Sequence, residues 1–282
     1  MKPNQTTHST TYLSIALVIL FIAAASAGCT SSARGTQGTA MATPAAAQES
    51  LLVFSGAGLK APMEDIATAF TQKYGIGIQY SYGGSGVLIT QMNLTHKGDV
   101  FIPGSTNEWK TAKAQGLVDS YELVAYHVPV IVVQKGNPKG ITSLKDFTQP
   151  GLKVALGDVN ATAIGKAGAK MFKRQNITAA VEKNVVTRTP TINELVTIMN
   201  AGQADAAILT LDNVKADKMD MIEIPVAENE VLITPIGVTT FTQNSDGAAK
   251  FVAFVASDEG KAIFGKHGFP IYPDPVYANV QP

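Results

Sequence analysis

The chain has 282 residues, of which 45% are hydrophobic, and its 22 basic residues balance its 22 acidic residues. A net charge of zero gives no support for binding nucleic acid or a membrane surface through bulk charge. The single cysteine, Cys29, excludes an intramolecular disulfide. Its place near the N-terminus leaves the folded part without thiolate metal sites or cysteine catalysis.

The N-terminal segment is typical of an export signal. A charged start is followed by an apolar run over residues 12–27 and by small residues before Cys29. We therefore expect residues 1–29 to form a signal peptide with lipidation at Cys29. Because Ser26 stands where the usual lipobox has leucine, an uncleaved N-terminal anchor helix is the alternative. Both interpretations place the remainder outside the cytoplasmic membrane, in the periplasm or on the outer cell surface. Residues 30–50, rich in small and polar side chains, are predicted to form a flexible tether.

The folded part begins with a predicted strand, tight turn and helix. The apolar run 51–54 leads into the turn 55–58, whose sequence is Ser-Gly-Ala-Gly, and apolar residues follow at helical spacing from Leu59 to Phe70. The small turn leaves backbone N–H groups bare at a helix N-terminus, beside the hydroxyl of Ser55. Such a turn favours the binding of an anion.

The same construction recurs along the chain. A strand at 76–82 leads into the turn 83–86, Gly-Gly-Ser-Gly, and a helix; a strand at 99–103 precedes a helix at 107–116. Strands that alternate with helices predict βαβ units in a mainly parallel sheet, with ligands bound beyond the carboxyl ends of the strands.

A second α/β region follows, which predicts two lobes. Further strands are expected at 123–133, 152–156, 185–187, 204–209 and 231–241, and further helices at 143–147, 161–174, 191–200 and 247–263. The strands 123–133 and 231–241 are long and contain Pro129 and Pro235, so we expect edge or connecting strands there. They would be the crossovers of an α/β protein whose first lobe comprises residues 51–130 and 236–282 and whose second comprises residues 131–235. A ligand would lie in the cleft, and the crossovers would act as a hinge.

Motifs of catalysis are scarce. His96, His127 and His267 are scattered singly, without the HxH or HExxH spacing of a metal site. The G-x-S-x-G, P-loop and GxGxxG patterns are absent from the sequence. Trp109, the only tryptophan, is expected to contribute to packing. We therefore expect a binding protein rather than an enzyme, with no cofactor.

Four predicted helix starts form a set, at 55–58, 84–86, 157–160 and 191–192. Each offers N–H groups that carry part of the positive charge of the helix dipole. Several such ends in one cleft can hold a dianion without Lys or Arg, with directional hydrogen bonds that discriminate by size and protonation state. The alternative for each glycine is a simple tight turn, and for each serine it is capping of a helix.

The ordered segments VFSGAGLKAPMEDIATAF, YSYGGSG, GDVFIPG, LKVALGDVNATAIG, TINELV, ADAAI and FGKHGF together resemble the periplasmic molybdate-binding proteins of ABC transporters. The resemblance spans most of residues 51–268. It implies a two-lobed periplasmic-binding-protein fold of type II, a molybdate or tungstate ligand, an ABC permease in the membrane as partner, and a monomer. Matched by position, the implied ligand-binding residues are Ser55, Gly56, Gly58, Gly84, Ser85, Ala155, Asp158, Ile192 and Thr210.

Two departures from the family pattern leave the coordination open. A common form of the family has tyrosine at the end of the ADAAI strand, where this chain has Leu209 and Thr210. Some archaeal members of the family place carboxylates on the metal, but Asp158 and Asp212 are the only acids near this strand end and neither matches that position. Asp158 fits a turn-forming role better than that of a ligand. The alternatives are a binding protein for sulfate, phosphate or a larger solute, a sensor domain, or an extracytoplasmic enzyme acting on a phosphate or sulfate ester.

Overall fold

The computed structural model describes residues 49–282. The predicted signal peptide, the lipidation of Cys29 and nearly all of the predicted tether lie outside the described residues. Within residues 49–282 there is no helix whose length and apolar character would let it cross a membrane.

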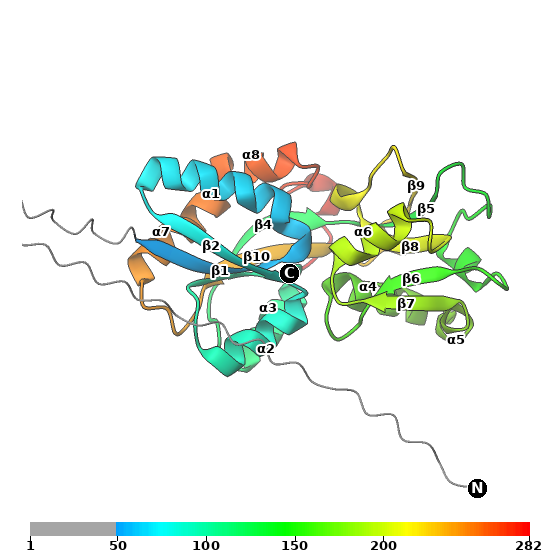
Figure 1. Ribbon diagram of the computed structural model, residues 1–282, viewed down its shortest axis with the longest axis horizontal. Coiled ribbons are helices and arrows are strands. Elements are labelled where there is room, and N and C mark those ends of the chain that lie inside the picture. The colour runs from blue at the N-terminus through cyan, green and yellow to red at the C-terminus, as the bar shows by residue number, and fades with distance from the viewer. Residues whose placement is uncertain (1–48) are drawn as a thin grey trace, which may run out of the picture. The chain divides into compact units, whose positions relative to one another are not determined.

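The described residues form two lobes, each built on a five-stranded sheet (Figure 1). The strands of the first sheet lie in the order β2-β1-β3-β10-β4. They are β1 (Ser50–Gly56), β2 (Gly77–Gly83), β3 (Val100–Ile102), β4 (Glu122–His127) and β10 (Leu232–Val238). The helices of this lobe are η1 (Ala57–Leu59), α1 (Lys60–Tyr74), α2 (Ser85–Thr95), α3 (Thr106–Ala114), α7 (Ser245–Ala256) and α8 (Asp258–Lys266). A short η4 (Pro275–Tyr277) lies near the C-terminus.

Both faces of the first sheet are buried, because successive residues of β1 point to opposite sides. Val53 packs into a core with Met63 and Phe251, from α1 and α7. Its neighbour Phe54 packs into a second core with residues of α2 and α3, including the fully buried Trp109. Figure 1 shows α1 and α8 on one side of this sheet and α2 and α3 on the other. This double burial explains why 51–54 is an apolar run rather than an alternating one.

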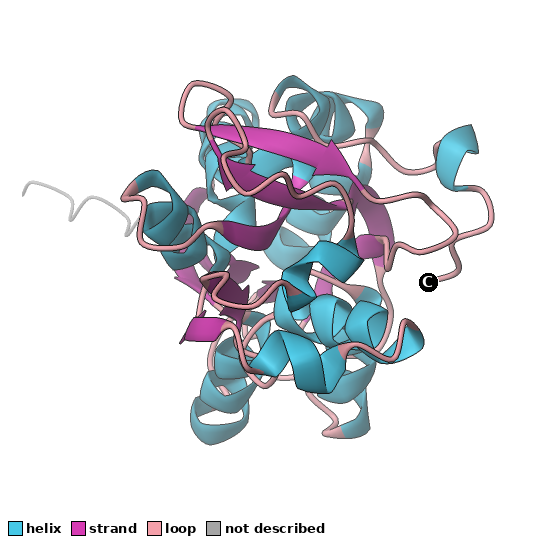
Figure 2. Cartoon of the chain, turned by 90° about the vertical axis from the view of Figure 1, so that its right-hand side faces the viewer, coloured by secondary structure: helices cyan, strands magenta, loops and turns pink. Residues whose placement is uncertain are grey.

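The second sheet has the order β7-β6-β8-β5-β9. Its strands are β5 (Pro129–Gln134), β6 (Val154–Gly157), β7 (Val185–Thr189), β8 (Ala206–Thr210) and β9 (Met219–Glu223). Its helices are η2 (Leu144–Thr148), α4 (Ala163–Arg174), α5 (Thr178–Glu182), α6 (Ile192–Asn200) and η3 (Leu211–Asn213). Viewed from the side of this lobe, helices flank the strands on opposite sides (Figure 2).

The chain crosses between the sheets twice. The first crossing is at Val128, which separates β4 in the first sheet from β5 in the second. The second is residues 224–231, between β9 and β10. The predicted run 123–133 is thus two strands rather than one. The run 231–241 is not itself a crossover, since β10 lies wholly in the first sheet.

The expectation of edge or connecting strands holds for 123–133, which connects the two sheets and whose first half, β4, is an edge strand, but the strands that carry the prolines, β5 and β10, are internal. Pro129 is tolerated because it is the first residue of β5, and Pro235 is tolerated because the pairing of β10 with β4 shifts register between Thr234 and Pro235. The sheets are mixed rather than mainly parallel, because β10 pairs antiparallel with β3 and β4, and β5 pairs antiparallel with β8 and β9. The exact lobe boundaries stay a prediction.

One predicted helix is two. The pattern at 247–263 is interrupted at Ser257, whose backbone is extended and whose hydroxyl accepts a hydrogen bond from the Gly260 N–H at 3.3 Å. Serine there ends α7 and caps α8. The sequence predicted one helix because apolar residues continue at helical spacing across the break between α7 and α8.

Candidate functional site

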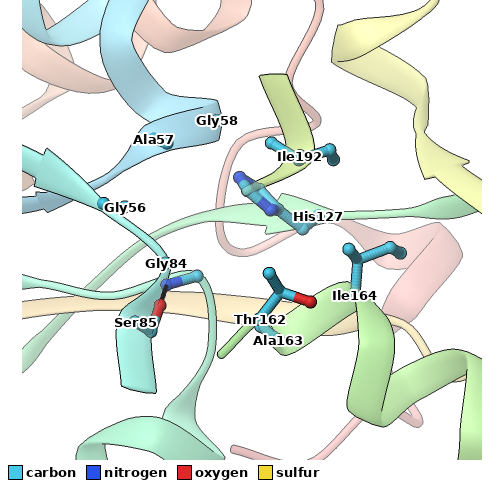
Figure 3. Close-up of a pocket in the computed structure, with 12 residues that line it drawn as sticks. Gly56, Ala57, Gly58, Gly84, Ser85, His127, Thr162, Ala163, Ile164 and Ile192 are labelled. Carbon is cyan, nitrogen blue, oxygen red and sulfur yellow. Dashed lines mark hydrogen bonds between the residues drawn. The ribbon is translucent and has the colours of Figure 1, made fainter. Parts of the chain in front are cut away.

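A small cavity of about 40 Å³ lies between the two lobes (Figure 3). It is enclosed by the ends of β1 and β2, the loop after β3, the last residue of β4, and the first turns of α2, α4 and α6. Its lining residues are Gly56, Ala57, Gly58, Gly83, Gly84, Ser85, Gly104, His127, Thr162, Ala163, Ile164 and Ile192. None of these is Lys, Arg, Asp or Glu, so a bound anion would meet neutral donors and one histidine.

The first lobe contributes helix starts without capping side chains. Gly56 precedes η1 and Gly84 precedes α2, and neither position has a side-chain hydrogen bond to the helix. Because no side chain caps these ends, their N–H groups are available to other acceptors, and the Ala161 carbonyl of the second lobe takes that of Gly86. Ser85, the first residue of α2, is 4% exposed. Its Oγ accepts a hydrogen bond from the Gly104 N–H at 3.0 Å, which leaves the hydroxyl hydrogen free to donate into the cavity.

The second lobe contributes two helices with threonine caps. Thr162 Oγ1 accepts from the Gly165 N–H at 3.0 Å and donates to the Asp158 carbonyl at 2.9 Å. At the start of α6, Thr191 Oγ1 accepts from the Glu194 N–H at 3.2 Å, which is one half of the predicted capping box, and donates to the Glu194 carboxylate at 2.9 Å. Each cap occupies only the third N–H of its helix. The first N–H groups of both helices, beside the cavity, are left for a ligand.

The lobes touch each other around the cavity. The Gly86 N–H donates to the Ala161 carbonyl at 3.0 Å, and the Asn193 side-chain amide donates to the Ala57 carbonyl at 2.9 Å. On the α3 side, Lys166 Nζ lies 2.9 Å from a carboxylate oxygen of Glu108, which is 1% exposed. The lobes are therefore in a closed arrangement.

Close approach of the lobes depends on glycine. A Cβ at Gly84 would lie 2.3 Å from the Pro190 carbonyl oxygen, and a Cβ at Gly86 would lie 2.0 Å from that of Asn160. Both distances are well inside van der Waals contact, and the obstructing atoms are backbone. The turn at 83–86 therefore fits the second lobe only without side chains at these two positions.

The predicted site residues divide into two groups. Those that line the cavity are Gly56, Gly58, Gly84, Ser85 and Ile192. Those that do not are Ser55, Ala155, Asp158 and Thr210. The part of both groups in binding stays a prediction.

The residues of the second group are occupied elsewhere. Ser55 is fully buried in β1, and its hydroxyl lies 3.4 Å from the Gly56 carbonyl. Ala155 is enclosed in the core of the second lobe. Asp158 Oδ1 accepts from the N–H groups of residues 160 and 161 at 2.8 and 3.0 Å, which is the expected turn-forming role. Thr210 Oγ1 accepts from the Asn213 amide at 3.0 Å.

Sequence reasoning missed several lining residues. The start of α4 is at Ala163 rather than near Asn160, so Thr162, Ala163 and Ile164 line the cavity in place of the turn at 157–160. A threonine directly before an apolar pair was the available signal, since threonine is a favoured cap. His127 gave no such signal, because its place depends on where the chain crosses between the lobes.

His127 is the titratable side chain of the lining. It is 5% exposed, and its Nε2 is enclosed without a hydrogen-bond partner. Burial lowers its pKa below the ordinary histidine value, and the nearby carboxylate of Asp212 opposes that shift. Burial in turn raises the pKa of Asp212, against the effects of His127 and of hydrogen bonds with Thr210 and Asn213. The two groups form an electrostatically coupled pair beside the cavity.

Two α/β lobes joined by two crossing segments, with a small cavity between them, define a two-lobed periplasmic-binding-protein fold of type II. A family model described as bacterial extracellular solute-binding protein matches residues 51–270, and the chain belongs to this family.

Known relatives include binders of more than one oxyanion. The chain is 28% identical over 261 residues to the molybdate-binding protein ModA of Mycobacterium bovis, which covers 91% of this chain and 97% of the relative. Among solved structures, the periplasmic molybdate-binding protein of Azotobacter vinelandii has a TM-score of 0.66 at 17% identity, with 78% of this chain and 98% of that chain covered. The sulfate-binding protein SubI of Mycobacterium tuberculosis has a TM-score of 0.71 at 19% identity, with 83% and 92% covered. The two structures support the fold alone.

Proposed function

We propose that this chain is the extracytoplasmic substrate-binding component of an ABC importer, which captures molybdate or tungstate between its lobes and delivers it to a membrane permease. The observation that carries the proposal is the set of helix starts from both lobes around one small cavity whose lining lacks Lys and Arg. Neutral N–H and O–H donors suit a dianion that is stripped of its water. The name of the Mycobacterium bovis relative favours molybdate.

Capture would work by closure. An anion held by α2 of one lobe and by α4 and α6 of the other stabilises the arrangement in which all three helix starts meet. Residues 224–231 and Val128 are the segments that would absorb the hinge motion. The closed form is then the one offered to the permease.

Sulfate is the second candidate, because a relative that is 26% identical over 251 residues is named a sulfate-binding protein. Molybdate and tungstate are nearly equal in size and larger than sulfate, so the dimensions of the closed cavity would decide between them. Hydrolysis of a phosphate or sulfate ester at a meaningful rate would favour an enzyme instead.

The test is thermal unfolding of the protein with each of molybdate, tungstate, sulfate and phosphate, at matched ionic strength. An anion present at about 100 times its dissociation constant stabilises the folded state by roughly 2.7 kcal/mol. We expect this shift with molybdate or tungstate. Stabilisation by sulfate or phosphate, with none by molybdate or tungstate, would contradict the proposed ligand.

Lipid anchoring is a separate proposal, resting on the sequence around Cys29. The intact mass of the protein from the membrane fraction tests it. A mass increased by a lipid group on a chain that begins at Cys29 is the expected result.

A further inference from the structure

His127 differs from every other residue of the cavity lining, because it alone is titratable. It is the last residue of β4, one position before the chain crosses to the second lobe at Val128. Its ring lies beside Gly58 and Ile192 (Figure 3). A Cβ built at Gly58 would lie 3.6 Å from the ring carbon Cε1, so the imidazole lies against the helix start that the first lobe offers to the ligand.

One ring nitrogen of this histidine, Nε2, is unsatisfied. The side chain is 5% exposed, and Nε2 has no hydrogen-bond partner within the described residues. A buried imidazole nitrogen without a partner costs free energy. The histidine therefore indicates a missing partner, and it lines a cavity that also presents unpaired donors.

Asp212 is the charged group that acts on His127. It lies in η3, and its Oδ1 is likewise enclosed without a partner. The other elements around the ring contribute Gly58, Ile192 and Phe269, whose ring centroid is 5.1 Å from that of the imidazole, and none of these titrates. The next charged groups line an adjoining cavity of about 520 Å³; they are Lys60, Glu64, Lys215 and His267.

We propose that His127 is a ligand-contacting residue. As an imidazolium it donates one hydrogen bond to the bound oxyanion and faces Asp212 with the other side of its ring, so that anion binding takes up one proton. The proposal deepens the proposed function and rests on it, since it requires an oxyanion in this cavity.

The sign of the coupling follows from the groups present. In the empty cavity, burial favours the neutral imidazole. A dianion at contact favours the charged form, so its binding raises the pKa of His127 and draws a proton from solvent. Affinity for the anion therefore increases as the pH falls through the interval between the His127 pKa values of the filled and the empty protein. A site made only of backbone N–H groups and a serine hydroxyl would show no such dependence.

The experiment is calorimetric titration of the tightest-binding oxyanion into the protein at several values from about pH 5.5 to about pH 8.5, a range around the ordinary histidine pKa of about 6.5. Each titration is repeated in two buffers of different ionisation enthalpy, which gives the number of protons taken up. We expect an uptake approaching one proton per anion within the interval. Within that interval the dissociation constant should increase by up to about tenfold for each unit by which the pH is raised.

Three variants assign the proton. His127→Gln keeps a hydrogen-bond donor but cannot be protonated, and it should bind without proton uptake and with a flat pH profile. Asp212→Asn removes the counter-charge of the imidazolium and should move the profile to lower pH. His96→Asn is the control: His96 ends α2 with a left-handed backbone, φ 46°, which asparagine tolerates, and its profile should match the wild type.

The outcomes separate the two proposals. If the wild-type protein binds an oxyanion but takes up no proton and shows a flat profile, His127 is not protonated on binding and this inference is wrong, while the proposed function stands. Unchanged proton uptake in a folded His127→Gln variant would also overturn it. If the folded wild type binds no oxyanion at any pH, the proposed function itself fails. The wild-type measurement decides the matter even if the Gln variant does not fold.

Discussion

The two lobes line the cavity with different groups. The first lobe supplies five glycines together with Ala57, Ser85 and His127, so its side of the cavity is mostly bare backbone. The second lobe supplies Thr162, Ala163, Ile164 and Ile192, all of which carry side chains on the first turns of capped helices. The first lobe therefore presents mainly backbone atoms to the cavity, and the second lobe presents apolar side chains and one threonine hydroxyl.

This difference teaches that the glycines of the first lobe serve two purposes. At Gly56 and Gly84 they leave the helix starts without a capping side chain, and at Gly84 and Gly86 they let the backbone of the second lobe come close. Gly84 and Gly86 lie against the carbonyl oxygens of Pro190 and Asn160, where a methyl group would overlap with backbone. The approach of the lobes therefore depends on the turn 83–86, which is also the turn of the proposed ligand site.

The largest effect is expected from Gly86→Ala. The new Cβ would lie 2.0 Å from the Asn160 carbonyl oxygen, and only movement of the lobes apart relieves that overlap. Overpacking commonly costs about 1–3 kcal/mol, which is a loss of roughly five- to over a hundredfold in affinity, and rigid backbone places this case at the upper end. Titration calorimetry measures the loss.

The thermal stability of ligand-free Gly86→Ala should not fall with the affinity. Alanine is a better helix former than glycine by about 1 kcal/mol, so the ligand-free variant should unfold at an equal or higher temperature. The matched control is Val87→Ala, at the next position of α2, whose side chain is 50% exposed. Wild-type affinity in Gly86→Ala would mean that the lobes do not close against this turn.

An intermediate effect is expected from Ser85→Ala. The change removes the hydroxyl donor. It also frees the Gly104 N–H, which in the wild type donates to the Ser85 Oγ at 3.0 Å. A hydrogen bond to a charged group contributes about 1.5–3 kcal/mol, of which the freed N–H recovers part, so we expect about tenfold weaker binding. Calorimetry with Ser81→Ala as the control, whose hydroxyl bonds Gln91 on the surface, makes the comparison. Equal losses in the two variants would remove Ser85 from the site.

Thr162→Ala tests the second lobe and should lower stability more than affinity. The hydroxyl caps α4, and loss of such a cap costs about 1 kcal/mol of the free energy of unfolding. Urea unfolding of the ligand-free protein measures this cost. Unchanged stability with strongly weakened binding would instead indicate that the threonine hydroxyl contacts the anion directly.

The smallest effect is expected from Lys166→Met, which removes the ion pair that joins the lobes through Glu108. Because the lysine side chain is 37% exposed, solvent screens the pair, and we expect a loss of affinity below about 1 kcal/mol, or about threefold to fivefold. The loss should shrink at high salt. Lys73→Met breaks an exposed pair within the first lobe and is the control. A larger loss in the control would show that the pair at Lys166 does not support closure.

The sequence predicted most of the fold and part of the cavity. Local signals sufficed for the helix starts at Ser85 and Ile192, where small residues or a capping box precede an apolar helical pattern. They also sufficed for the recurrence of strand, turn and helix in two lobes. The confirmed fold class and family rest on the order of these units along the chain.

What the sequence could not supply is long-range geometry. His127 reaches the cavity only because β4 ends where the chain leaves the first sheet, and an isolated histidine carries no sign of that position. The sequence predicts one continuous strand at 123–133 because both of its halves are buried and apolar, although the halves, β4 and β5, belong to different sheets. The packing of Gly84 and Gly86 on the second lobe is likewise invisible until the lobes are placed together.

The burial of Trp109 in α3 has a practical consequence. It is the only tryptophan in the chain, it is fully buried, and its ring stacks on Phe101 with centroids 5.9 Å apart. Its neighbour in sequence, Glu108, is the residue paired with Lys166 of the other lobe. The tryptophan fluorescence of the unlabelled protein therefore comes from a single site next to the junction of the lobes. Stopped-flow emission should report the rate of closure without any engineered probe.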